Sequence, residues 1–202
     1  MRTTVALATL AFMTFGLPCA HASEQTLTLD PAATEIAFEL PATGHDVHGA
    51  LVLRSAEIRF DPDSGLAAGR LVVDAASAHT GSDSRDKKMH GEVLESTKFP
   101  LIVFTAERMA GRLKLPGESR IDLHGKLALH GSEHPFTLPV TVTVEGDGLS
   151  AATRFDVPFV EWGLADPSIL FLKVDKTVAV KVVAHGRLSA PSATAAVSGG
   201  GR

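Results

Sequence analysis

The most informative pattern in the chain is the alternation of apolar and polar side chains over residues 120–145. Apolar residues or glycine occupy every second position over 121–129, and after a loop at 131–133 the same alternation returns over 136–144. A period of two predicts extended strands with one buried and one solvated face, and a short loop containing glycine between them predicts a β-hairpin. Because two strands cannot bury such a face by themselves, the rest of the chain must cover it.

Six further stretches alternate in the same way and predict six more strands. They are residues 27–40, 43–60, 66–77, 101–108, 149–157 and 174–188. A shift of phase between Leu53 and Ala56 predicts a β-bulge, which bends a strand around a barrel. The apolar residues of segment 83–96 are instead near helical spacing, so we expect one helix there with Asp83 as its N-cap.

The order of these elements predicts an all-β fold with one short helix between the third and fourth strands. Turn signals between consecutive strands favour an antiparallel, eight-stranded, up-and-down barrel. An immunoglobulin-like sandwich is the alternative, but a helix after the third strand fits it poorly.

The first residues of the chain predict export from the cytoplasm, and the charge gives no sign of a nucleic-acid partner. Residues 1–22 have one basic residue, an apolar run and a small-x-small site ending at Ala22, which predict a secretory signal peptide; a retained membrane anchor is the alternative. Cleavage would remove Cys19, the only cysteine. The net charge of −4 and the absence of a basic run give no reason to expect a nucleic-acid partner. We expect a barrel domain over 23–188, a disordered tail over 189–202, and no stable membrane insertion.

Three blocks of sequence, in order, resemble the YceI-like family. Residues 74–109 contain a strand, an Arg-Asp pair that opens a helix, and a Phe-Pro-x-Ile-x-Phe strand. Residues 125–140 contain the motif Gly-x-Leu-x-Leu-His-Gly, followed by a Leu-x-Val strand. Residues 159–188 contain Trp-Gly before a Val-rich strand. The chain departs from the commonest pattern in having Ala78-His79 in place of Ile-Asp, and Lys-Lys-Met-His in the helix in place of His-Leu. The resemblance, over residues 27–188, implies a lipocalin-like barrel, usually periplasmic, that binds a polyisoprenoid or another long apolar ligand in its lumen.

The inner faces of the strands are the expected ligand site. Small residues in these rows leave room for a cavity, although some could be glycines at barrel corners; the resemblance favours a cavity. Gly125 in particular is expected to face the open lumen. The expected lining residues are Phe38, Leu51, Phe104, Leu123, Gly125, Leu127, Phe136, Leu138, Val142, Phe155 and Trp162.

The polar end of a ligand would lie at the barrel rim, for which Arg85, Asp86 and His45 are the candidates. In one interpretation Arg85 contacts a polar head group. In the other, which we favour, the Arg-Asp pair fastens the helix to the barrel rim through hydrogen bonds. His45 is then a rim or packing residue.

Two rival functions rest on polar side chains. His130 and His134 flank the hairpin loop, with His124 expected on the same solvated face, and could bind zinc or copper; a pair of solvated histidines is the favoured interpretation. Ser84, Asp86 and His90 could be imagined as a hydrolase triad, but residues two apart on a helix point in different directions. We therefore expect a binding or carrier protein for a lipid-like ligand, with no catalytic step and no cofactor, and a homodimer remains open.

Overall fold

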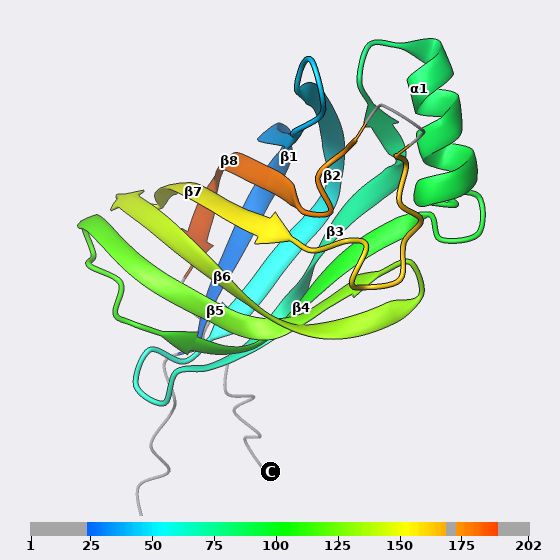
Figure 1. The fold of residues 1–202 in the computed structure, drawn as a ribbon. Coiled ribbons are helices and arrows are strands. Elements are labelled where there is room, and N and C mark those ends of the chain that lie inside the picture. The colour runs from blue at the N-terminus through cyan, green and yellow to red at the C-terminus, as the bar shows by residue number, and fades with distance from the viewer. Residues whose placement is uncertain (1–23, 169–172, 190–202) are drawn as a thin grey trace, which may run out of the picture.

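Eight antiparallel strands form a closed barrel in the computed structural model, which describes residues 24–168 and 173–189. Each strand pairs with the next one along the chain, and the last pairs with the first, so the sheet has no free edge (Figure 1). The strands are β1 Gln25–Leu40, β2 Val47–Phe60, β3 Leu66–His79, β4 Leu101–Ala110, β5 Gly117–Leu129, β6 Ser132–Glu145, β7 Gly148–Val157 and β8 Val178–Ser189. The predicted barrel and strand order are confirmed, and β8 includes Ser189, one residue beyond the predicted domain end. The predicted signal peptide and the rest of the tail lie outside the described residues.

The hairpin of β5 and β6 is confirmed, but its turn lies one residue earlier than predicted. Leu129 pairs with Ser132, which leaves His130 and Gly131 as a two-residue turn. Both have positive φ, 52° and 81°, as the tight hairpin turn that matches strand twist requires. The sequence pattern placed the turn at residues 131–133, because the alternation of apolar and polar residues resumes clearly only after Glu133.

Bulges and glycines let the long strands coil tightly enough to close the barrel. The predicted bulge is confirmed, since the pairing of β2 with β3 shifts between Leu53 and Ser55. Gly125 pairs with Ala106 beside another register shift, and a Cβ at Gly125 would overlap the carbonyl oxygen of Thr105. Gly125 therefore allows two strands to approach closely at a corner, which is a common use of glycine in barrels.

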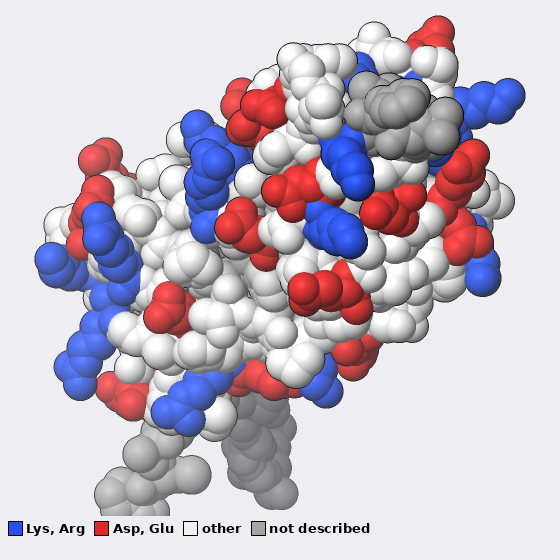
Figure 2. Space-filling model, viewed as in Figure 1, with Lys and Arg blue, Asp and Glu red and all other residues white. Residues whose placement is uncertain are grey.

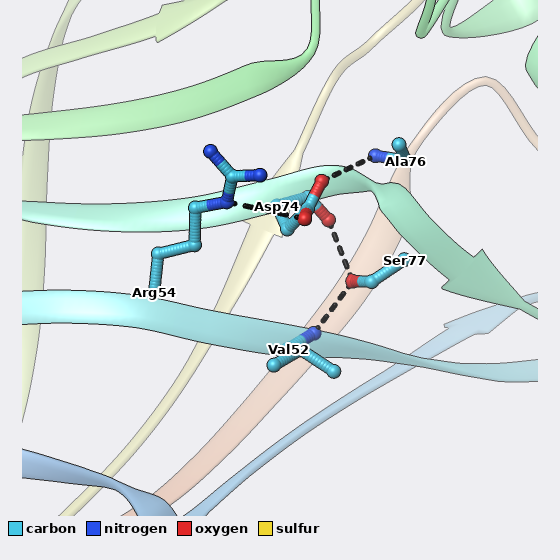
Figure 3. A network of polar contacts seen from close by, with 5 residues as sticks. All are labelled: Val52, Arg54, Asp74, Ala76 and Ser77. Carbon is cyan, nitrogen blue, oxygen red and sulfur yellow. Dashed lines mark hydrogen bonds and ion pairs between the residues drawn. The ribbon is translucent and has the colours of Figure 1, made fainter.

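A polar network on the outer face marks the point where β3 leaves its partner and turns toward the helix. The pairing with β2 jumps from Val52–Asp74 to Ala50–His79. In the gap, the Ser77 hydroxyl donates to the carbonyl oxygen of Asp74 at 2.6 Å and accepts from the backbone N–H of Val52 at 2.8 Å, so a side chain replaces the missing backbone pair (Figure 3). The Asp74 carboxylate accepts from the Arg54 side chain at 3.1 Å and from the N–H of Ala76 at 2.9 Å.

The helical segment between β3 and β4 stands at one end of the barrel, at the upper right of Figure 1. It consists of α1 Asp83–Lys88 followed directly by a π-helical turn, Met89–Val93. The predicted helix is confirmed, but its N-cap is Ser82, whose side chain makes no capping hydrogen bond, and Asp83 is the first helical residue. The π-helical turn contains Gly91, which weakens regular α-helix.

The surface in view mixes the two signs of charge, and acidic and basic side chains alternate over it (Figure 2). Within the described residues, no helix has both the length and the apolar character needed to cross a bilayer.

Candidate functional site

A cavity of about 610 Å³ occupies the half of the barrel nearest to α1. Its wall is almost entirely apolar. Residues from the inner faces of all eight strands contribute to it. The aliphatic and aromatic strand residues of the wall are Leu29, Ile36, Phe38, Leu40, Val47, Leu51, Leu53, Leu71, Val73, Ala78, Ile102, Phe104, Leu127, Leu129, Leu138, Phe155, Val157, Val178, Val180 and Val182. A cavity of this size and character suits an apolar ligand chain.

The helical segment closes part of the cavity from above. Met89 and Val93 of the π-helical turn, and Leu94 after it, line the cavity. The connection after β7 contributes Phe159 and Leu164. The segment is too short to be a stable helix by itself. Its apolar residues pack onto the barrel, and such tertiary contacts supply most of the stability of short helices.

Six of the eleven residues expected to line the lumen do line the cavity. They are Phe38, Leu51, Phe104, Leu127, Leu138 and Phe155. Contact between a ligand and these side chains stays a prediction.

The other five expected residues do not line the cavity, and three of them belong to the opposite half of the barrel. Leu123 and Val142 are 8% and 1% exposed and lie in the packed core there. The expectation that Gly125 faces open space is wrong, since the space beyond it is filled by the Thr105 backbone and the Phe104 ring. That half of the barrel is therefore filled by side chains.

Phe136 and Trp162 do not line the cavity, although Phe136 belongs to the same inner row of β6 as the lining residue Leu138. Phe136 packs edge-on against the cavity residue Phe155 with ring centroids 5.4 Å apart, and against Trp162 at 5.8 Å. Trp162 also stacks on His134, with centroids 4.1 Å apart and an angle of 3° between the rings. These rings therefore pack next to the cavity wall, on the side of Phe155.

The Arg-Asp pair is fastened to the end of β3 through Thr80. The Asp86 carboxylate accepts hydrogen bonds from the Thr80 hydroxyl at 2.6 Å and from its backbone N–H at 2.9 Å. These bonds, the hydroxyl first, hold the pKa of the Asp86 carboxyl below its usual value. Arg85 donates from Nε to the same hydroxyl oxygen at 2.8 Å. Asp86 does not line the cavity, whereas Arg85 does, so both sequence interpretations describe part of the geometry.

His45 lies at the mouth, in the loop between β1 and β2. It is exposed and lines the cavity together with Thr43. The loop is held by an isolated bridge between Ala42 and Val174, and by a hydrogen bond from the Thr43 N–H to the carbonyl oxygen of Lys173 at 2.8 Å. Exposed residues on two sides of the cavity, His45 and Ser84, mark where it reaches the surface.

Further polar contacts secure the helical segment over the barrel. His90 contacts the carbonyl oxygen of Ala78 through Nε2 and the Ser96 hydroxyl through Nδ1, both at 2.9 Å. Because a carbonyl can only accept, Nε2 carries a proton. At the far end of the segment, Glu95 and His130 are joined at 2.6 Å.

Among the described residues, neither the histidine metal site nor the hydrolase triad considered from the sequence is assembled. His130 lies in the turn and contacts Glu95, while His134 lies in the inner row of β6 opposite Leu127 and stacks on Trp162. The expectation of a shared solvated face for the histidines is therefore wrong for His134. Within residues 24–168 and 173–189, no three potential metal ligands gather. Asp86 binds Thr80 and His90 binds Ser96, so neither is directed at Ser84.

Sequence reasoning missed several residues at the mouth, of which Lys88 and Thr80 are the most important. Both line the cavity, and Lys88 donates to the carbonyl oxygen of Pro167 at 3.3 Å. Helical spacing could have indicated Lys88, which lies three positions after Arg85 and so on the same helix face.

The fold and cavity define a class of protein: a closed antiparallel barrel with an apolar internal cavity and a short helical segment over its end. The model of the YceI-like domain matches residues 27–185, and the chain belongs to this family. The UPF0312 proteins of Vibrio vulnificus strains YJ016 and CMCP6 are each 27% identical over 142 residues, which is 68% of this chain and 72% of each relative.

Two solved structures share the fold. A polyisoprenoid-binding domain from Saccharophagus degradans, implicated in plant cell wall breakdown, has a TM-score of 0.65 and 19% identity, and the match covers 82% of this chain and 98% of that one. BcnA of Burkholderia cenocepacia has a TM-score of 0.63 and 20% identity, with 78% and 98% covered. At these identities the likeness concerns the fold.

Proposed function

We propose that this protein binds one long-chain amphiphile, of the polyisoprenoid or quinone-like class, and carries it without a chemical step. The apolar chain occupies the cavity and the polar end lies at the mouth beside α1. The observation that carries this proposal is the cavity of about 610 Å³, whose wall is almost entirely apolar and whose basic and imidazole side chains, such as Arg85 and His45, lie at the mouth. Burying an apolar chain there is favourable in proportion to the area removed from water.

The fold likeness to a polyisoprenoid-binding domain supports the same ligand class. The alternative of an enzyme acting on a lipid in the same barrel has no assembled nucleophile and base among the described residues, since His90 is bound to the buried Ser96, which does not line the cavity.

The test is to extract freshly purified protein with organic solvent and to identify the released molecules by mass spectrometry. Val182 lines the cavity, so Val182→Trp should place a ring in the ligand's space and deplete the extract. Val52 is 51% exposed on the outer face, and Val52→Trp is the matched control that should retain the ligand. An extract without lipid from the parent protein, together with no binding of added prenyl alcohols, would refute the proposal.

We also propose that the carrier works in the periplasm or after secretion, once the first 22 residues are removed. The apolar run before the small-x-small site at Ala22 supports export. The intact mass of protein recovered from outside the cytoplasm should correspond to a chain that starts at Ser23. A mass that includes Met1, or a lipid attached to Cys19, would contradict this.

A further inference from the structure

Two basic side chains of α1 share the polar mouth of the cavity. Arg85 and Lys88 are three residues apart, which places them on the same face of the helix, and both are partly buried and line the cavity. Each is anchored through one contact, Arg85 Nε to the Thr80 hydroxyl at 2.8 Å and Lys88 Nζ to the carbonyl oxygen of Pro167 at 3.3 Å. These partners are neutral, so they orient the two cations without balancing their charge.

Neither cation forms an ion pair with a carboxylate within the part of the chain that the structure describes. The cavity-lining residues include no aspartate or glutamate, and neither Arg85 nor Lys88 takes part in the ion pairs found in residues 24–168 and 173–189. Asp86, next to Arg85, accepts from the same Thr80 hydroxyl that Arg85 contacts, but it lies outside the cavity wall, so no carboxylate among the described residues faces the mouth itself. The mouth therefore combines two positive charges with the hydroxyl groups of Thr80 and Ser84.

We propose that the cavity selects amphiphiles with an anionic oxygen head group, such as a phosphate monoester, over neutral amphiphiles with the same chain. This inference rests on the proposed lipid-binding function. An anionic head at the mouth would accept charge-assisted hydrogen bonds from the guanidinium and ammonium groups, which are stronger than those of a neutral hydroxyl. Arginine also presents several N–H donors in a planar fork that suits phosphate, and only Nε is used by Thr80.

The test compares geranylgeranyl phosphate with geranylgeraniol, which share one chain and differ in the head group. Both compete against an uncharged fluorescent probe, N-phenyl-1-naphthylamine, for delipidated protein at low salt. We expect the phosphate to bind roughly 10- to 100-fold more tightly, which is the range for charge-assisted hydrogen bonds. Raising the salt concentration should weaken binding of the phosphate far more than binding of the alcohol, because exposed charges are screened.

Lys88→Met keeps the length of the side chain and removes its charge, and should reduce the preference for the phosphate about tenfold. Lys87→Met is the matched control, since Lys87 is the exposed neighbour outside the cavity wall and its loss should leave the preference unchanged. Equal affinities for the two ligands, or equal effects of the two variants, would overturn the inference while leaving the proposed function intact. Failure of both ligands to bind would overturn the proposed function itself.

Discussion

Two leucines of β5 offer a test of the division between an open and a filled half of the barrel. Leu123 and Leu127 lie on the same inner face, four residues apart, and each is 8% exposed. Both belong to the buried core, but Leu127 lines the cavity, whereas Leu123 does not. Shortening each to alanine removes the same atoms from two surroundings that differ in whether empty space is already present.

The cost of Leu→Ala combines the lost burial of the side chain with a contribution from the new void. At Leu123 the void is created inside packed core, and we expect a loss of about 4 kcal/mol in the free energy of unfolding. At Leu127 the change only enlarges a cavity of about 610 Å³, and one side of the side chain has no packing contacts to lose. We expect a loss of about 2 kcal/mol there, near the lower end of the range for such substitutions.

Urea unfolding of the delipidated proteins measures both losses, provided that the dependence of the free energy of unfolding on urea concentration is the same in parent and variants. A difference of about 2 kcal/mol corresponds to roughly 4–8 °C in Tm for a domain of this size. Lipid binding should change in Leu127→Ala and stay unchanged in Leu123→Ala. Equal costs, or a larger cost at Leu127, would refute the division, because they would mean that side chains fill both halves.

Three other predictions follow from single contacts. Gly125→Ala should lower the free energy of unfolding by more than about 2 kcal/mol, since the new Cβ overlaps the Thr105 carbonyl oxygen. Gly91→Ala has open space around the new Cβ and should raise the free energy of unfolding by up to about 1 kcal/mol. Urea unfolding of both variants tests this pair of expectations. His134→Phe should keep the stack on Trp162 and raise Tm, because it removes a buried Nε2 that has no hydrogen-bond partner among the described residues; a lower Tm would indicate a partner for that nitrogen. Asp86→Asn should lower the free energy of unfolding at neutral pH. Because folding lowers the pKa of Asp86 from 3.8, the difference in this free energy between variant and parent should shrink as the pH falls below 3.8. A difference that is constant from pH 7 to pH 2 would contradict this.

The strand order, the hairpin and the bulge in β2 could be predicted because the period of two depends only on which face a residue occupies. Depth along the barrel axis is different, since Leu123 and Leu127 have the same parity and similar neighbours in sequence but lie in the filled and open halves. Which level of a barrel is filled depends on the sizes of side chains that meet from eight tilted strands. No local pattern contains that information.

The mouth was harder to predict because its side chains come from irregular segments. The sequence indicated Arg85 and His45, but Lys88 became relevant only when the helix face toward the cavity was known. His134 was assigned to the wrong face because the turn was placed one residue late in the hairpin, while its actual partner is Leu127. Gly125 shows a similar limit, since a glycine that opens space and a glycine that fills a corner look the same in sequence.

If the protein carries a lipid as proposed, the filled half of the barrel limits that lipid to one way in and out. Buried side chains such as Ile58, Phe60, Met109 and Val144 fill the end opposite α1, so a lipid chain that entered beside α1 would leave by the same route, tail last. The polar end of the bound lipid would then always lie at the rim beside α1. A donor that loads this carrier and an acceptor that unloads it would compete for one docking face, so loading and delivery would be successive encounters rather than a relay through the molecule.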